Sequence, residues 1–261
     1  MQSRSLLLFH ALFSILFPIF INVLTIHPAT AQLPYRDDAR RARALAPSLD
    51  FNAVELGGTH SCALQANGTA YCWGRGNFGQ LGNGKEVGSA VPTPVTGGHL
   101  FSSLAVGNMH TCAVAYSGSV YCWGSNGSGK LSQESAVVFS SELVQVSGIG
   151  NATLVSAGND HSCAVNSTGH MFCWGTNLYG ELGFGSSALS VPSPQLVVDI
   201  ENVVSIAAGG SHSCATVQNG SLYCWGLGSN GALGTASCEQ EWQVQAIPQG
   251  TWVRTQRLAV S

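Results

Sequence analysis

Short runs of apolar, β-prone residues separated by glycine turns recur along the chain, and one arrangement of them occurs four times. Each copy opens with an apolar run that ends at glycine, as Leu104-Ala105-Val106-Gly107 does. A His-Ser-Cys-Ala segment follows (His-Thr-Cys-Ala in the second copy), then a turn containing glycine, then an aromatic-Cys-Trp-Gly segment. Two β-prone runs around Asn-Gly or Ser-Gly are typical of a hairpin, so one hairpin is predicted in each copy.

The cysteines define the period of the repeat and the pairing within each hairpin. The first cysteine of each copy is Cys62, Cys112, Cys163 or Cys214, which gives a period of 50 to 51 residues. A second cysteine follows ten residues later, and a three-residue turn places the two directly opposite on one face. This geometry predicts disulfide bonds in the pairs Cys62–Cys72, Cys112–Cys122, Cys163–Cys173 and Cys214–Cys224. The ninth cysteine, Cys238, is either free or paired with a partner outside this chain.

The remainder of each copy predicts two further strands. The opening apolar run is one of them, and side chains alternate along a strand, so Tyr71 and Trp73 point away from the face that carries the cysteines. A glycine loop such as Gly79-Gln80-Leu81-Gly82 comes after the hairpin, and a segment with proline leads into a last short strand. About four strands in 50 residues are typical of a propeller blade. We therefore predict an all-β propeller of four-stranded blades over residues 49–250.

The patterns G-x-x-H-S-C-A, G-x-x-Y-C-W-G and G-Q-L-G resemble the repeat of the regulator-of-chromosome-condensation family of β-propellers. The resemblance covers residues 49–250 in four recognisable repeats, whereas the usual members of that family have seven blades. The cysteine pairs resemble the secreted, disulfide-bearing versions of the repeat. The chain is also similar in this respect to the β-lactamase inhibitory protein type of propeller.

The number of repeats does not determine how the propeller ring is closed. Residues 251–261 look like the start of a fifth repeat or a closing strand, because Leu258-Ala259-Val260 matches Leu104-Ala105-Val106. Three arrangements are compatible with this pattern: part of a longer chain, a small ring of four blades, or an assembly of two or more copies.

The N-terminal residues 1–31 are typical of a secretory signal peptide. Arg4 precedes an apolar stretch, and Ala29-Thr30-Ala31 predicts cleavage between Ala31 and Gln32. The alternative is an uncleaved anchor, since the apolar stretch approaches the ~20 residues that span a bilayer. Residues 32–48 form a leader whose Arg40–Arg43 run is either a processing site or a solvated segment. A secreted or cell-surface protein is expected, in a compartment that permits disulfides.

Composition and charge narrow the functional classes. The sequence is 45% hydrophobic and 9% charged, with 32 glycines, which suits a turn-rich β protein. Residues 49–250 contain three basic and eleven acidic residues, and three minus eleven gives a net charge of −8. Because nucleic-acid binding requires clustered lysine or arginine, a nucleic-acid partner is not expected.

The histidines and the glycine-rich motif of this sequence do not support a catalytic or cofactor site. His60, His110, His161 and His212 occupy one equivalent position per repeat, so they form a ring and do not meet at one metal ion. We predict a structural hydrogen bond from each to neighbouring backbone. Gly74 to Gly79 match G-x-G-x-x-G but lie in a β-repeat without a following helix. No catalytic residue, metal or cofactor is therefore assigned.

Five N-x-S/T sequons predict glycosylation if the chain is secreted: Asn67, Asn126, Asn151, Asn166 and Asn219. The repeats differ most in four segments that are candidates for ligand contacts: residues 85–90, 132–141, 186–190 and 235–242.

The sequence as a whole favours a secreted or cell-surface propeller that binds a protein or a surface glycan without catalysis. Inhibition of a hydrolase is one form of that function. The family resemblance implies an alternative, a guanine-nucleotide exchange factor for a Ran-like small GTPase. A further alternative is the ectodomain of a larger membrane protein, and a membrane contact is expected only under that alternative or with an uncleaved signal.

Overall fold

The computed structural model describes residues 49–133, 136–235 and 239–247. The predicted signal peptide with its Ala31–Gln32 cleavage site, the leader 32–48 with Arg40–Arg43, Cys238 and residues 251–261 lie outside the described residues. Internal contacts divide the chain into Met1–Ser48 and Leu49–Ser261, and all of the described residues belong to the second unit.

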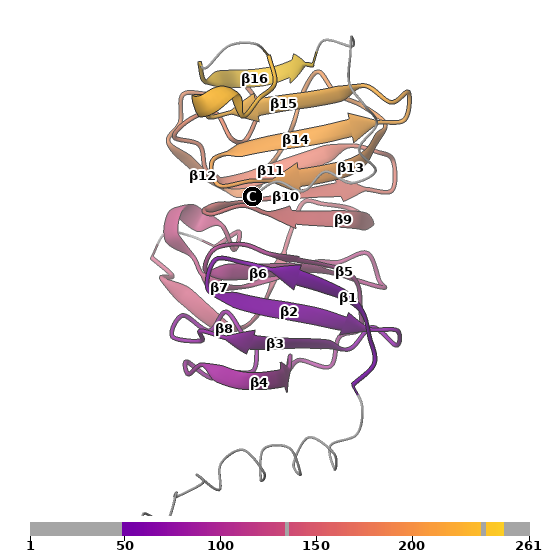
Figure 1. The fold of residues 1–261 in the computed structure, drawn as a ribbon, viewed down its shortest axis with the longest axis vertical. Coiled ribbons are helices and arrows are strands. Elements are labelled where there is room, and N and C mark those ends of the chain that lie inside the picture. The colour runs from indigo at the N-terminus through magenta and orange to yellow at the C-terminus, as the bar shows by residue number, and fades with distance from the viewer. Residues whose placement is uncertain (1–48, 134–135, 236–238, 248–261) are drawn as a thin grey trace, which may run out of the picture. The chain divides into compact units, whose positions relative to one another are not determined.

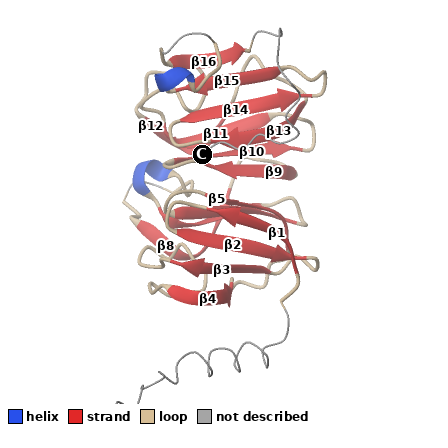
Figure 2. Cartoon of the chain, viewed as in Figure 1, coloured by secondary structure: helices blue, strands red, loops and turns tan. Residues whose placement is uncertain are grey.

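Strands make up almost all of the regular structure in the described residues (Figures 1 and 2). They run β1 Phe51–Leu56, β2 His60–Gln65, β3 Ala70–Gly74, β4 Ser89–Pro94, β5 Phe101–Val106, β6 His110–Ala115, β7 Val120–Ser125, β8 Phe139–Val146, β9 Ala152–Ala157, β10 His161–Asn166, β11 Met171–Thr176, β12 Ser190–Leu196, β13 Val203–Ala208, β14 His212–Val217, β15 Leu222–Gly226 and β16 Glu241–Ala246. Two short 3-10 turns, η1 Gly127–Gly129 and η2 Ser229–Gly231, follow β7 and β15. Within the described ranges no helix is long and apolar enough to cross a membrane.

The strands form four antiparallel sheets of four strands each, one per repeat, in the order β1-β2-β3-β4 and its equivalents. This confirms the predicted four-stranded repeats. In the first hairpin, the Gln65 N–H donates to the carbonyl of Thr69, and Gly68 has a φ of +86°. A side chain would be strained at such a φ, so glycine closes the three-residue turn.

Each hairpin places its two cysteines directly opposite each other, with 4.1 Å between the Cα atoms of Cys62 and Cys72. The other three bridges, Cys112–Cys122, Cys163–Cys173 and Cys214–Cys224, repeat this arrangement. The outer strands β4 and β12 contain the prolines. Proline lacks an N–H for the sheet and is tolerated at an edge strand, where that donor has no partner to lose.

Successive sheets pack through two different faces, which we call the disulfide face and the tryptophan face. The disulfide face of the first sheet carries Cys62 and Cys72, covered by Leu81 from the loop after β3, and the tryptophan face of the second carries Trp123 and Leu104. Together they form one buried cluster, and the second–third and third–fourth junctions are built in the same way. The hydrophobic core is therefore divided among the junctions between repeats.

Candidate binding site at the loop end of the repeats

Every sheet has two ends with different chemistry. The turns inside the cysteine hairpins lie at one end, which we call the turn end. The short turns between the first and second strands, and the long connections from the third to the fourth strand, lie at the other end, the loop end. The repeated histidines begin the second strands, so they stand at the loop end.

Each histidine at a junction binds a hydroxyl group of the next repeat. His60 Nε2 lies 2.7 Å from Thr111 Oγ1, and that hydroxyl donates to the carbonyl of Gln80 at 3.0 Å. At the next two junctions, His110 and His161 contact the Ser162 and Ser213 hydroxyls at 2.9 Å, and those donate to the carbonyls of Lys130 and Glu181. The predicted structural role holds, but the direct partner is a side chain of the next repeat.

This relay determines the tautomer of the histidines. Since the Thr111 hydroxyl proton goes to a carbonyl, Nε2 of His60 must be the donor and Nδ1 carries no proton. The Nδ1 atoms of His60 and His110 are buried without a partner among the described residues. Burial lowers the pKa of His60 and that of His161 to about 4, so the rings are neutral at neutral pH.

The glycine three residues before His110 and the one before His161 make room for the imidazole rings. A Cβ atom on Gly107 would lie 2.7 Å from Nδ1 of His110, and one on Gly158 would lie 2.6 Å from Nδ1 of His161. Both distances are too short for an ordinary contact. The G-x-x-H spacing is thus a packing requirement of the junction.

A neighbouring serine and histidine could in principle form a nucleophile and its base. Ser213 does not fit that role, because it is fully buried and its proton is directed to the Glu181 carbonyl, away from His161. The same geometry recurs at Thr111 and Ser162. The described residues also contain no cluster of three or more His, Cys, Asp or Glu side chains suited to a metal ion.

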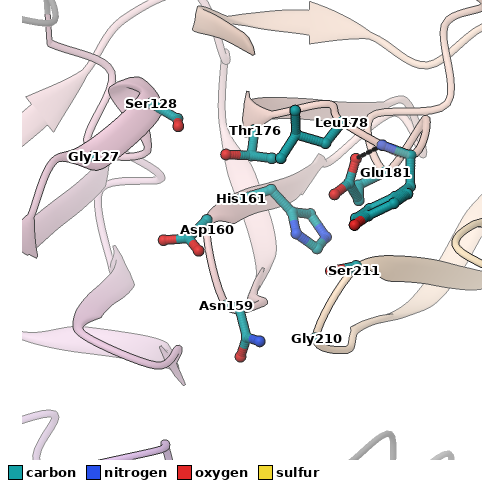
Figure 3. Close-up of a pocket in the computed structure, with 11 residues that line it drawn as sticks. Gly127, Ser128, Asn159, Asp160, His161, Thr176, Leu178, Glu181, Gly210 and Ser211 are labelled. Atoms are coloured by element: carbon teal, nitrogen blue, oxygen red, sulfur yellow. Dashed lines mark hydrogen bonds between the residues drawn. The ribbon is translucent and has the colours of Figure 1, made fainter. Parts of the chain in front are cut away.

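A cavity of about 270 Å³ opens at the loop end, lined by residues of the second, third and fourth repeats (Figure 3). Its walls come from η1, the β9–β10 turn, the segment after β11 and the β13–β14 turn. Asn159, Asp160 and Ser211 supply polar groups, and the His161 ring is directed toward the space beside Ser211 and Glu181 (Figure 3). Leu178, half of whose surface is exposed, adds an apolar edge.

Three charged side chains lie near this cavity: Lys130 and Glu181 from the glycine loops after β7 and β11, and Asp160 from the β9–β10 turn. The buried ammonium group of Lys130 pairs with the Asp160 carboxylate, which is 53% exposed. Glu181 is buried, and burial raises the pKa of its carboxyl group although the Tyr179 N–H donates to it at 2.8 Å. The arrangement offers hydrogen-bond donors and acceptors with one exposed negative charge.

Family comparison identifies the repeat. Two models described as the regulator of chromosome condensation (RCC1) repeat match the chain, one over residues 67–114, 117–165 and 168–216 and the other over 51–80, 101–130, 152–181 and 203–232. The chain belongs to the RCC1 repeat family. The ultraviolet-B receptor UVR8 of Arabidopsis thaliana is 34% identical over 189 residues, which are 69% of this chain and 42% of the receptor. The human E3 ubiquitin-protein ligase HERC2 is 30% identical over 183 residues, which are 69% of this chain and 3% of the ligase.

Solved structures show the same RCC1-type fold. Human WBSCR16 superimposes with a TM-score of 0.71 at 25% identity, over 78% of this chain and 55% of that protein. Prp20p from Saccharomyces cerevisiae gives a TM-score of 0.69 at 22% identity, over 78% of this chain and 52% of that protein. The chain therefore spans about half the length of these relatives, and less than half of UVR8.

The five sequons are distributed unevenly over the RCC1 repeats. Asn67 and Asn219 are exposed in hairpin turns, Asn166 ends β10 at such a turn, and Asn151 is exposed beside two of the turns. These four lie at the turn end. Asn126 differs, because it is buried at the loop end and its amide group donates to the carbonyls of Gln133 and Val137. We therefore expect no glycan on Asn126.

Sequence reasoning did not find the structural role of Asn126, the Lys130–Asp160 pair or the cavity. Asn126 has an equivalent in Asn177, which is also buried and accepts a hydrogen bond from Leu182 as Asn126 does from Leu131. The fixed distance of five residues from asparagine to leucine in the second and third RCC1 repeats was the available signal. The cavity carried no such signal, because its walls come from four separate segments.

Proposed function

We propose that this protein is an extracellular, non-catalytic module of the RCC1 repeat family that binds a protein through the loop end of its third and fourth repeats. The observation that carries the proposal is the difference between the two ends of the sheets. Four of the five sequons lie at the turn end, and the recessed polar cavity and the variable connections lie at the loop end. Glycans at the turn end would leave the loop end open to a partner.

Four disulfides support the extracellular part of the proposal. All eight bridged cysteines are buried, between 0% and 5% exposed, and each bridge lies in the core of a junction or end face. Disulfides of this kind persist in oxidising compartments. The signal-like residues 1–31 support the same compartment.

Chemistry and comparison favour a protein ligand. The cavity is small and lined by polar groups, with Leu178 and Tyr179 exposed at its edge, which suits insertion of a side chain from a protein surface. Prp20p, which shares the fold, is described with its binding to Gsp1p and histones. A surface glycan is the competing ligand class, and inhibition would follow if the bound protein were an enzyme.

We do not extend exchange activity on a Ran-like GTPase to this chain. That activity belongs to a reducing compartment, in which the four bridges would be open. Opening them would place eight thiols in the junction cores.

The test uses a photo-activated cross-linking residue at position 178, at the edge of the cavity, and a control at Tyr116, which is 62% exposed at the turn end. The secreted protein is incubated with extracellular proteins of its host. Cross-links to one discrete protein from position 178 and none from 116, abolished by Tyr179→Ala and kept by Tyr116→Ala, would support the proposal. Equal cross-linking at both positions, binding only to a glycan array, or turnover of a substrate would contradict it.

A further inference from the structure

The position of Glu181 in the glycine loop carries a different side chain in each repeat. Gln80 and Lys130 are its equivalents in the first and second repeats, and all three side chains are buried at the loop end. The Lys130 ammonium group pairs with Asp160 of the next repeat. The residue of the fourth repeat equivalent to Asp160 is Ser211, which carries no charge. Glu181 therefore meets a neutral residue at the position where Lys130 finds a counter-ion.

Within the described ranges no basic side chain forms an ion pair with Glu181. Residues 49–250 contain Arg75, Lys85 and Lys130, and the one ion pair among the described residues joins Lys130 to Asp160. Burial raises the pKa of the Glu181 carboxyl group, and the Asp160 charge adds to that rise. The two carboxylates thus lie close enough to repel each other, and they share one cation. When both are ionised, the cavity has an excess of one negative charge.

The His161 ring adds an unpaired acceptor to the same cavity. Its Nε2 donates to the Ser213 hydroxyl, because that hydroxyl donates to the Glu181 carbonyl, so Nδ1 carries a lone pair and no proton. The side chain is only 1% exposed, and in the described part of the chain no group donates to Nδ1. His161 lines the cavity, and its ring is directed into it (Figure 3). A buried acceptor without a donor costs free energy, which a donor from a ligand would recover.

These three groups define the chemistry of a ligand. The ionised carboxylates of Asp160 and Glu181 accept hydrogen bonds, and Nδ1 of His161 can only accept. All three residues line the cavity, and Figure 3 shows the His161 ring between Asp160 and Glu181 in the view. Ammonium and guanidinium groups donate hydrogen bonds without accepting any, and they carry a positive charge. Leu178 and Tyr179 are exposed at the edge, where they can cover the methylene stem of such a side chain.

We propose that the cavity binds a basic side chain, lysine or arginine, of the partner protein. This inference rests on the proposed function, because it names the chemical group through which the loop end recognises its partner. A neutral group such as a sugar hydroxyl could donate to the same acceptors, but it would leave the negative charge of the cavity uncompensated. A basic side chain supplies both the hydrogen-bond donors and the counter-ion that Lys130 supplies to Asp160 from within the chain.

Small basic probes test this chemistry before the partner is identified. The full chain, produced through a secretory pathway with its disulfides intact and its histidines isotopically labelled, is titrated with n-butylammonium chloride and with n-butylguanidinium chloride at constant ionic strength. n-Butanol is the neutral probe with the same alkyl chain. We expect the nuclear magnetic resonance signal of His161 Nδ1, assigned by its loss in His161→Gln, to shift saturably with a basic probe and not with n-butanol. The basic probe that binds more tightly distinguishes lysine from arginine.

Glu181→Gln is the disrupting variant, because the first repeat shows that glutamine fits this position. Gln80 Oε1 accepts a hydrogen bond from the Phe78 N–H at 2.9 Å. The Glu181 carboxylate accepts the equivalent bond from the Tyr179 N–H at 2.8 Å. Glu142→Gln is the matched control, which removes the same charge from an exposed position on β8. The dissociation constant of the basic probe should rise at least about tenfold in Glu181→Gln and stay within about twofold in Glu142→Gln.

The outcomes separate this inference from the proposed function. Binding of n-butanol as tight as that of the basic probes, no shift with either basic probe, or unchanged binding in Glu181→Gln would overturn the inference. If one protein cross-links from position 178 equally well in Glu181→Gln and in the unchanged protein, the proposed function stands and the inference is wrong. If the basic probes bind as expected but no protein cross-links from position 178, the preference of the cavity for a basic group stands and the proposed function is wrong.

Discussion

Trp73 and Trp123 occupy the same position of the same repeated sequence, yet their surroundings differ. Trp123 is fully buried against the first sheet and donates to the Gln80 carbonyl, whereas Trp73 is partly exposed and has no acceptor among the described residues. The motif therefore specifies the chemistry of a face, and the neighbouring repeat decides whether that chemistry is used. Paired substitutions at equivalent positions can measure the contribution of the neighbour.

The largest difference is expected for the tryptophans themselves. Trp123→Ala should lower the free energy of unfolding by about 3–5 kcal/mol. Trp73→Ala should lower it by roughly 1 kcal/mol, because less surface and no hydrogen bond are lost. Urea unfolding followed by circular dichroism measures both. Equal losses would show that the first face is as well packed as the second.

Histidine gives the next largest difference, and it depends on pH. The pKa of His161 is lowered by burial and by nearby His212, to about 4, while Asp160 opposes the shift. Below pH 6.5 this histidine is protonated in the unfolded chain but stays neutral in the folded chain. The free energy of unfolding therefore falls by ~1.4 kcal/mol per pH unit until the pH reaches the pKa of the folded state. The stabilisation by neutral His161 is fully present above pH 6.5 and is lost as the pH falls from 6.5 to about 4.

The measurement compares unfolding at pH 7 and pH 5 for the unchanged protein, His161→Gln and His212→Gln. His161→Gln should remove part of the loss, and His212→Gln should remove less, because His212 is only half-buried. Glu55 and Glu181 act in the opposite sense, since burial raises the pKa of each and the folded state binds their protons first. A loss unchanged by His161→Gln would contradict the neutral relay.

Asn126 and Asn67 form the third comparison. Asn126→Ala should lower the free energy of unfolding by roughly 2–3 kcal/mol, because two carbonyls and the Leu131 N–H lose their partner. Asn67→Ala should change it by less than about 1 kcal/mol, since the exposed side chain makes one local hydrogen bond. Mass spectrometry after glycosidase treatment of the protein, produced through the secretory pathway of a glycosylating host, should show Asn126 unmodified. A glycan on Asn126 would contradict its burial.

The hydroxyl groups give the smallest difference. Ser162→Ala removes the acceptor of His110 and one donor to the Lys130 carbonyl, at a cost of about 1–2 kcal/mol. Ser61→Ala should change the free energy of unfolding by less than about 0.5 kcal/mol, because the Ser61 hydroxyl has no hydrogen bond among the described residues. The same urea series measures both, and a large effect of Ser61→Ala would show that this hydroxyl already has a partner.

Much of the fold could be predicted from the sequence because it is set by short-range rules. The distance between the cysteines and the glycine turn determine the hairpin register, and Cys62 does lie opposite Cys72. The apolar runs likewise identified the first strand of each sheet, and the proline segments identified the fourth strands β4 and β12 of the first and third sheets.

The features that the sequence did not reveal depend on residues far apart in the chain. The hydroxyl partner of each histidine lies 51 or 52 positions away, at the start of the next repeat. Asn126 reads as a glycosylation site by its local motif, and only the packing of η1 and the following loop buries it. The exposure of Leu56 is also not encoded locally, because Val106 occupies the equivalent position of the next repeat and is buried.

The shared acceptor at each junction is a main-chain oxygen, and this has an evolutionary consequence. At each junction the indole and hydroxyl groups donate to the main-chain carbonyl of Gln80, Lys130 or Glu181. These hydrogen bonds therefore do not depend on which side chain that residue carries. An amide, an ammonium and a carboxylate side chain are equally compatible with these hydrogen bonds. Mutation can therefore reverse the charge beside a cavity, one repeat at a time, while the attachment between neighbouring repeats stays the same.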